Sequence, residues 1–283
     1  MIARDGRIVD APTVTVAVCT RNRPGKAVDV LRPLDGCDVQ RVVVDQSDRP
    51  EPAPRAFDGV WVYDGPRGLC EGRNVALRRS TSDVIWFVDD DVHLSPACLS
   101  ALRRVYGDAS VGAAVGRIVE RVALPNTRRV DARFGFDGRM RVRLDGWTPG
   151  TASTVKGANM SFRRAALAAA GGFDPAFDGT AFAEDADASA RVASMGWRIA
   201  FVPGASVVHD SAPAGGVRRP LPDAERDRMR LTGRWWARHR PAWAAIPAAA
   251  GLTVTALARP RGEAIGRIPE RLGAFWAGLK ADG

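Results

Sequence analysis

The chain has 283 residues, of which 46% are hydrophobic and 26% are charged. This length allows one or two domains with a core large enough to fold unaided, and the composition excludes a disordered or fibrous protein. The net charge of +9 comes from 41 Lys and Arg against 32 Asp and Glu, so nucleic acid, an anionic lipid surface and a phosphorylated substrate are all compatible partners.

The amino-terminal stretch MIARDGRIVDAP contains acids and no apolar run, which is typical of neither a secretory signal nor a membrane anchor. The four cysteines are too widely spaced for a metal knuckle or a dense disulfide scaffold; they are Cys19, Cys37, Cys70 and Cys98. We therefore expect free thiols and a cytoplasmic location.

The first two thirds of the chain alternate short β-branched runs with helical segments, which predicts an α/β domain with a largely parallel sheet. The expected strands are Thr13–Cys19, Arg41–Gln46, Val60–Tyr63, Val84–Asp89 and Val111–Val119. The expected helices between them are Gly25–Leu34, Cys70–Ser80 and Ser95–Tyr106. Residues 120–155 lack a clear period and are rich in Gly and Pro, which indicates an irregular or hairpin region.

The second half then predicts a helix over Phe162–Ala170, a Gly-Gly-Phe-Asp-Pro turn and a helix from Glu184 to Met195. A pair of strands is expected near Ile199–His209. Residues 1–215 would form one domain and residues 216–283 a helical tail.

Three of the predicted strands end in polar residues: Thr20-Arg21-Asn22, Asp45 and Asp89-Asp90-Asp91. In an open α/β sheet, ligands bind beyond the carboxyl ends of the strands, so these groups are expected to converge on one crevice. Three adjacent acids repel one another unless a cation is bound, and hard oxygen ligands suit Mg²⁺ or Mn²⁺. A solvated acidic turn before the helix at Ser95 is the alternative.

A second acidic group, Glu184 to Asp187, stands at the expected start of a helix. Acids in a first helical turn are favoured by the helix dipole without any catalytic role. Beside a metal site, however, such a carboxylate could take a proton from an attacking hydroxyl. His209 at a strand end is a candidate metal ligand or a structural residue, and His93 is expected on the surface.

Seven segments follow one another in the order VAVCTRNRP, VVVDQSD, GLCEGRNVAL, FVDDDVHLSP, GANMSFRR with GGFDPAF, AEDADASARVASMGW and SVVHD. Together and in this order they resemble the inverting glycosyltransferases of family 2. The resemblance covers about residues 12–210 and implies the GT-A fold, a Rossmann-like nucleotide-binding sheet flanked by helices. It implies a nucleotide-sugar-binding half over about 12–120 and an acceptor half over 121–215.

The resemblance also implies roles for individual residues. Asp185 would deprotonate the acceptor hydroxyl, with Glu184 orienting it or meeting the acceptor. The donor nucleotide would be bound by Thr20, Asn22, Asp45, Arg73, Asp89 and Asp90. Mn²⁺ or Mg²⁺ would be held by Asp91, Asp89 and His209. The family usually has Pro-Thr-Tyr-Asn where this chain has Cys19-Thr20-Arg21-Asn22, so the contacts to the donor base are expected to differ.

The tail from residue 216 is basic and rich in tryptophan. Residues 218–283 hold 13 basic and 6 acidic side chains, and Pro241–Ala258 is free of charge. This charge-free stretch is long enough to consider a membrane span, but its Ala, Pro and Gly content argues against one. We expect either a peripheral contact with the inner face of the membrane, or packing on its own domain or on a second copy.

The function expected from these features is metal-dependent transfer of a hexosyl or deoxyhexosyl unit from a nucleoside-diphosphate sugar. The acceptor hydroxyl would belong to a lipid-linked or cell-envelope glycan. A nucleotidyltransferase of related fold is the first alternative, although Arg21 to Lys26 do not form the glycine-rich loop that it would carry. Nucleic-acid binding through the tail is the second, and it is disfavoured because the rest of the chain is nearly neutral and has two acidic clusters.

Overall fold

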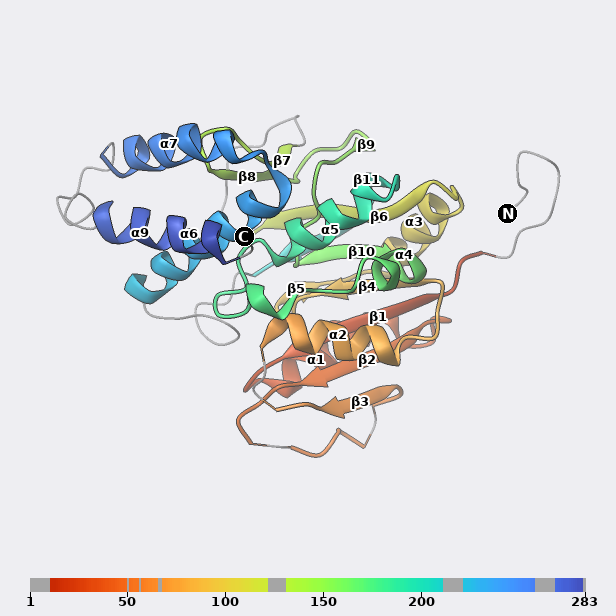
Figure 1. Ribbon diagram of the computed structural model, residues 1–283. Coiled ribbons are helices and arrows are strands. Elements are labelled where there is room, and N and C mark those ends of the chain that lie inside the picture. The colour runs from red at the N-terminus through yellow and green to blue at the C-terminus, as the bar shows by residue number, and fades with distance from the viewer. Residues whose placement is uncertain are drawn as a thin grey trace.

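A computed structural model describes residues 11–49, 51–55, 57–65, 68–121, 131–210, 221–257 and 268–281. Its centre is a mixed sheet in which the strands follow the order β3-β2-β1-β4-β10-β6-β11-β5, and β9 pairs with β11 (Figure 1). These strands are β1 Val14–Thr20, β2 Gln40–Asp45, β3 Val60–Tyr63, β4 Val84–Val88, β5 Val92–His93, β6 Val111–Glu120, β9 Gly150–Thr151, β10 Asn159–Arg163 and β11 Arg198–His209.

The amino-terminal half of the sheet is parallel, as the sequence predicts. β1 runs parallel to β2 and β4, and β2 runs parallel to β3. All five residues of β4, the apolar run Val84–Val88, are buried, as expected for a strand covered on both faces. This arrangement places the carboxyl ends of β1, β2 and β4 at one edge.

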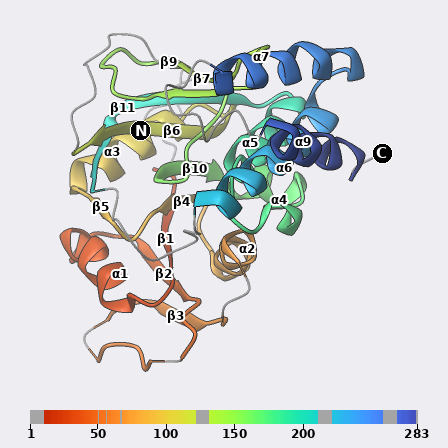
Figure 2. The same ribbon diagram turned by 90° about the vertical axis from the view of Figure 1, so that its left-hand side faces the viewer.

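Helices cover both faces of the sheet. They are α1 Pro24–Leu31, α2 Leu69–Arg79, α3 Pro96–Tyr106, α4 Arg164–Ala169 and α5 Glu184–Ser194. Figure 2 shows α1 and α3 on one face and α2, α4 and α5 on the other. Ser95 precedes α3 with extended backbone and Pro96 occupies the first turn, where its missing N–H has no intrahelical partner to lose.

Two predictions for the second half were wrong in detail. Phe162 lies in β10, which is antiparallel to β4 and β6, and the predicted helix begins only at Arg164. Pairing on both sides buries β10 and overrides the helical pattern of its sequence. The predicted strand pair near the carboxyl end is one strand, β11, whose register against β6 shifts between Val202 and Val207, so the intervening Pro-Gly makes a bulge rather than a turn.

The region expected to be irregular or to form a hairpin contains a two-stranded hairpin. β7 Asp131–Phe134 pairs with β8 Met140–Arg143, and β9 follows. Residues 122–130 of this region lie outside the described residues. The hairpin projects from the sheet toward the carboxy-terminal helices (Figures 1 and 2).

The tail packs on the rest of the chain, which was one of the two expected arrangements. Its helices are α6 Leu221–His239, α7 Ala245–Leu257 and α9 Ile268–Lys280, and they gather beside α5 and the hairpin (Figure 1). α6 and α9 cross in backbone contact: a Cβ on Gly233 would lie 2.0 Å from the Phe275 oxygen, and one on Gly278 would lie 1.8 Å from the Arg230 oxygen. Within the described residues, none of the helices has the length and apolar character needed to cross a membrane.

Candidate functional site

The polar strand ends converge as the sequence predicts. Thr20 and Asp45 are paired in register at the ends of β1 and β2. The Thr20 hydroxyl donates a 2.6 Å hydrogen bond to Asp90, which follows the end of β4. Three separate stretches of sequence therefore meet at one edge of the sheet.

Asp45 is fully buried at this edge. Its Oδ1 accepts hydrogen bonds from the backbone N–H and the hydroxyl of Ser47, at 2.9 and 2.5 Å. Its Oδ2 is also buried and has no hydrogen-bond partner among the described residues. A buried acceptor without a donor is costly, so this oxygen is suited to a donor group on a ligand.

Asp90 and Asn22 hold the surrounding loops. Besides the Thr20 hydroxyl, Asp90 binds Arg23 through a 2.6 Å contact, and burial raises the pKa of Asp90. Asn22 has a left-handed backbone and exchanges side-chain hydrogen bonds with Asp48. Both residues lie at the predicted edge, with their polar atoms engaged by protein partners.

Asp89, Asp91 and His209 form a cluster with metal-ligand chemistry. Each offers one ligand atom, and these atoms lie within 4.8 Å of one another. His209 Nε2 is 3.2 Å from Asp91, while its Nδ1 is 3.1 Å from Glu120. The hydrogen bond with Asp91 raises the pKa of His209 to about 9, with help from Glu120 and against the effect of burial.

The donor set of this cluster fits a divalent cation. Two carboxylates and one imidazole suit Mn²⁺ or Mg²⁺, with positions left for water or phosphate oxygens. Glu120 is a hydrogen-bond partner of His209 Nδ1, on the opposite side of the ring from Asp91. Such a carboxylate fixes the orientation of the ring, so that Nε2 would face a bound metal ion. The three residues come from the β4 end and from β11, which are distant in sequence.

Glu184 and Asp185 begin α5, and both are buried. Ala183 before them has a left-handed backbone, with φ of 70°. Arg73 from α2 donates a 2.6 Å hydrogen bond to Glu184. Burial and the neighbouring Asp185 carboxylate raise the pKa of Glu184 to about 7, although Arg73 opposes the shift.

Asp185 is held by backbone donors and one lysine. Its Oδ1 accepts from the N–H of Ala186 at 2.8 Å, and its Oδ2 accepts from the N–H of Gly157 at 2.9 Å. Lys156 Nζ lies 3.6 Å from Oδ2, and the charge of Asp185 raises the pKa of Lys156. The carboxylate is therefore fixed in orientation.

Arg73 connects the two acidic clusters. Its Nη1 contacts Glu184, and its Nη2 lies 3.9 Å from Asp89. The guanidinium also lies over the ring of Phe173, 5.3 Å from its centroid. The acids at the β4 end and at the start of α5 thus form one continuous site.

Asp187, the third acid of α5, has a different environment. It is fully buried and contacts Arg191 from its own helix together with Arg238 and His239 from α6. Burial opposes its ionisation, but the hydrogen bond from His239 and the charge of Arg191 hold the pKa of Asp187 below its usual value. It therefore joins α5 to the tail.

His93 lies outside the cluster, as expected for a surface histidine. Its ring is more than half exposed and contacts Asp210 at 2.8 Å. Sequence reasoning missed Glu120, Lys156 and Gly157. Gly157 begins the segment GANMSFRR that resembled the family, and Lys156 directly precedes it, whereas nothing near Glu120 in sequence points to His209.

A solvent-open cavity of about 1190 Å³ adjoins the start of α5. Ala186, which follows Asp185, lines it together with Thr154. Its other walls include Phe134 of the hairpin and Trp235 of α6, whose rings are stacked with centroids 4.1 Å apart. Arg240 also lines the cavity, and its guanidinium lies over the Trp235 ring.

The family model described as glycosyl transferase family group 2 matches residues 84–261, and the chain belongs to that family. The family match, together with this fold, makes the chain a glycosyltransferase. The succinoglycan biosynthesis protein ExoM of Rhizobium meliloti (strain 1021) is 29% identical over 215 residues, which are 71% of this chain and 67% of that protein.

Solved structures share the GT-A fold. GalNAc-T7, described with UDP, GalNAc and Mn²⁺, superposes with a TM-score of 0.66 at 13% identity; the match covers 97% of this chain and 58% of that one. The mannosyltransferase PcManGT of Pyrobaculum calidifontis, in complex with GDP-Man and Mn²⁺, gives 0.55 at 19% identity, with 96% and 88% covered. TarS 1-349 of S. aureus gives 0.58 at 15% identity, with 94% and 81% covered.

Proposed function

We propose that this chain transfers a hexosyl or deoxyhexosyl unit from a nucleoside-diphosphate sugar to an acceptor hydroxyl, with inversion at the anomeric carbon. The observation that carries the proposal is the contact of Arg73 with both Glu184 and Asp89. It sets Glu184, the neighbour of the candidate base Asp185, beside the candidate metal ligand Asp89. The solved structures described with UDP or GDP-Man and Mn²⁺ support a nucleoside-diphosphate donor and a divalent cation.

The donor nucleotide would bind at the ends of β1 and β2. The unpartnered Oδ2 of Asp45 would accept a hydrogen bond from the base, and Thr20 and Asn22 would shape the loop around it. Asp89 would face the ribose and diphosphate. Because Asp90 is engaged with Thr20 and Arg23, its part in donor binding would be to hold this loop in place.

Asp89, Asp91 and His209 would hold Mn²⁺ or Mg²⁺ against the diphosphate. A bound divalent cation would neutralise the charge that develops on the leaving diphosphate. Buried Arg73, close to Asp89, would add positive charge on the same side. A diphosphate leaves slowly unless its charge is compensated, so this end of the site favours bond cleavage.

Asp185 would act as the general base. The acceptor oxygen would attack the anomeric carbon as the bond to the diphosphate breaks, and its proton would pass to the Asp185 carboxylate. One displacement with one base inverts the configuration. Glu184 would position Asp185 and Arg73, and the cavity at Ala186 and Thr154 would receive the acceptor.

We also propose that the acceptor is a lipid-linked or cell-envelope glycan and that the tail meets the inner face of the membrane. The name of the ExoM relative refers to biosynthesis of the polysaccharide succinoglycan. Three large apolar side chains are mostly exposed here: Trp243 before α7, and Ile246 and Val254 on α7. Exposed apolar side chains of this kind are typical of segments that lie among lipid headgroups. Trp243→Glu with Ile246→Glu should reduce partitioning onto anionic vesicles; equal partitioning would contradict the membrane contact.

The main test measures thermal stability of the protein with UDP, GDP, dTDP or CDP, each with and without Mn²⁺ or Mg²⁺. A ligand that binds only the folded state raises its stability with affinity and concentration. We expect one nucleotide to stabilise the protein in a metal-dependent manner and Asp91→Ala to lose the effect. Transfer of the matching sugar to an acceptor then tests the reaction. Absence of any metal-dependent stabilisation would contradict the proposed donor site.

A further inference from the structure

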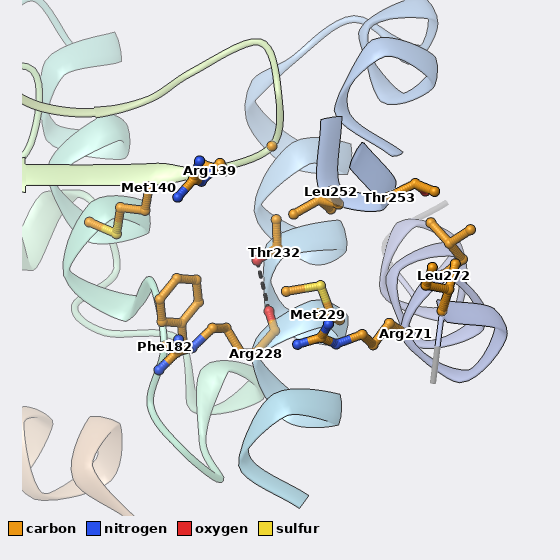
Figure 3. Close-up of a pocket in the computed structure, with 12 residues that line it drawn as sticks. Arg139, Met140, Phe182, Arg228, Met229, Thr232, Leu252, Thr253, Arg271 and Leu272 are labelled. Atoms are coloured by element: carbon orange, nitrogen blue, oxygen red, sulfur yellow. Dashed lines mark hydrogen bonds between the residues drawn. The ribbon is translucent and has the colours of Figure 1, made fainter. Parts of the chain in front are cut away.

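A second cavity lies between the hairpin and the carboxy-terminal helices, apart from the acidic site. It measures about 870 Å³, including the space open to solvent. Figure 3 shows side chains from β8, α6, α7 and α9 surrounding it. Met140, Met229, Leu252 and Leu272 give it apolar walls. Unbranched Met side chains adapt to flexible apolar ligands.

The polar part of the cavity is positive. Arg139, Arg228 and Arg271 line it, and none of its described lining residues is acidic. Arg271 binds Glu225, but its Nε is buried and has no hydrogen-bond partner among the described residues. Arg228 lies over the Phe182 ring, 5.1 Å from the centroid. In the part of the chain described, Arg139 and Arg228 line the cavity, and no ion pair joins either of them to a carboxylate.

This combination favours a ligand with two chemically different parts. A purely apolar ligand would leave the arginines without an anion, and inorganic phosphate would leave the apolar walls in contact with water. The planar guanidinium fork binds two phosphate oxygens at once, so an anionic phosphate matches these side chains. A long-chain phosphate ester satisfies both parts of the cavity.

The cavity extends from α7 to Phe182, which precedes α5 in the chain. Leu252 and Thr253 line it, while the adjacent Val254 is largely exposed. On the opposite side, Phe182 lies two residues before Glu184 and contacts Phe134 of the hairpin, with ring centroids 6.3 Å apart. A ligand in the cavity would thus reach from an apolar surface toward the start of α5.

We propose that this cavity binds a single-chain lipid phosphate, with its hydrocarbon against Met140, Met229 and Leu252 and its phosphate at Arg228 and Arg139. The proposal deepens the proposed function, on which it rests, by assigning the lipid part of the acceptor to a separate site. It makes the tail part of substrate recognition as well as a covering of the core.

The test is binding of farnesyl phosphate to the full chain, below the concentration at which the lipid forms micelles. Farnesol and inorganic phosphate are the comparison ligands, and calorimetry gives each Kd. We expect farnesyl phosphate to bind at least about tenfold more tightly than either part, in line with two linked sets of contacts. Equal binding of inorganic phosphate and farnesyl phosphate would overturn the proposal.

Variants locate the site. Arg228→Gln and Arg139→Gln should each raise the Kd for farnesyl phosphate about tenfold or more, as expected for loss of a charge-assisted contact. Leu252→Trp should fill the cavity and have a similar effect. Arg226→Gln on the same helix is the matched control, because Arg226 is exposed and pairs with Asp223. If Arg226→Gln weakens binding as much as Arg228→Gln, the ligand does not occupy this cavity.

The assay separates this inference from the proposed function. Lipid binding needs no donor, and the nucleotide experiment needs no lipid. Metal-dependent nucleotide binding without selective farnesyl phosphate binding would overturn the lipid site alone. The reverse result would support the lipid site and contradict the donor site. Circular dichroism of each variant verifies that the fold is retained.

Discussion

Arg73 on α2 and Glu184 on α5 form a buried ion pair, with Nη1 2.6 Å from Oε1. Both side chains are at most 5% exposed. The pair joins α2, which follows β3 of the parallel part of the sheet, to α5, which carries Asp185. It links positions 111 residues apart in the chain.

Arg73→Met should strongly destabilise the protein, because it leaves the Glu184 carboxylate buried without its cation. Removing one partner of a buried pair typically costs about 3–5 kcal/mol of unfolding free energy. Urea denaturation measures the loss. Arg78→Gln, which breaks an exposed pair with Glu71 on the same helix, should cost less than about 1 kcal/mol. Equal losses in the two variants would contradict this account of Arg73.

Asp185→Asn should abolish sugar transfer and leave donor binding intact. The amide keeps the shape of the side chain but cannot accept the acceptor proton, and loss of a general base lowers rates by about 10²–10⁴-fold. Transfer assays and nucleotide thermal shifts on the same preparation measure the two effects. Asp178→Asn is the control, because Asp178 contacts the backbone of Cys70 rather than the acidic site. Full turnover by Asp185→Asn would assign the base elsewhere.

The transfer rate should rise with pH through about 7. Below this value Glu184 holds a proton, because burial and Asp185 raise its pKa to about 7. Above it, Glu184 is ionised and pairs fully with Arg73, which fixes the guanidinium between Glu184 and Asp89. The measurement is kcat/KM from pH 5.5 to 8.5. Glu184→Gln should remove the inflection near 7, and an unchanged profile in that variant would exclude Glu184 as its origin.

Glu120→Gln should weaken Mn²⁺ binding without removing any of the three candidate ligands. Glu120 contacts the Nδ1 side of His209, and loss of such a supporting carboxylate costs about 10–100-fold in metal affinity. Electron paramagnetic resonance of free Mn²⁺ measures the Kd. Asp210→Asn, which alters the nearby surface contact with His93, is the control. Identical affinities in Glu120→Gln and the unmodified protein would show that Glu120 does not position the ring.

Asp187→Asn should weaken the packing of α6 against α5. The substitution removes the negative charge that faces Arg191 and Arg238, and it leaves these two cations around a neutral amide. A loss of about 3–5 kcal/mol in unfolding free energy is expected. Relative to the unmodified protein, amide hydrogen exchange in the variant should be faster in α6 and unchanged in α2. Asp223→Asn, an exposed acid on α6, should leave exchange unchanged; protection in α6 equal to that of the unmodified protein would rule out this anchoring role.

The sequence predicted the parallel half of the sheet well because its strands are short, apolar runs that end in polar residues. Val84–Val88 is an example: its burial on both faces requires an uninterrupted apolar run. The antiparallel strand β10, NMSFR, was missed although it alternates polar and apolar residues, because it has only five residues and the expected helix was extended back over Phe162. Its structure depends on pairing with β4 and β6.

For the site, sequence could identify acids but not their partners. It grouped Glu184, Asp185 and Asp187 as neighbours, yet each contacts a different set of side chains in the fold. Asp187 depends on His239, 52 residues away, and no local pattern indicates that contact. The same holds for His209 and Glu120, which meet only because β6 and β11 pair in parallel.

The crossing of α6 and α9 restricts how this tail can be exchanged with that of another transferase. At Gly233 and Gly278 the two helices touch through their backbones, so a side chain at either position would collide with the backbone of the other helix. A chimera would have to import both helices together, and would also need Arg238 and His239 to meet Asp187. New acceptor preferences carried by the tail would therefore arise through coordinated substitutions rather than by recombining single helices.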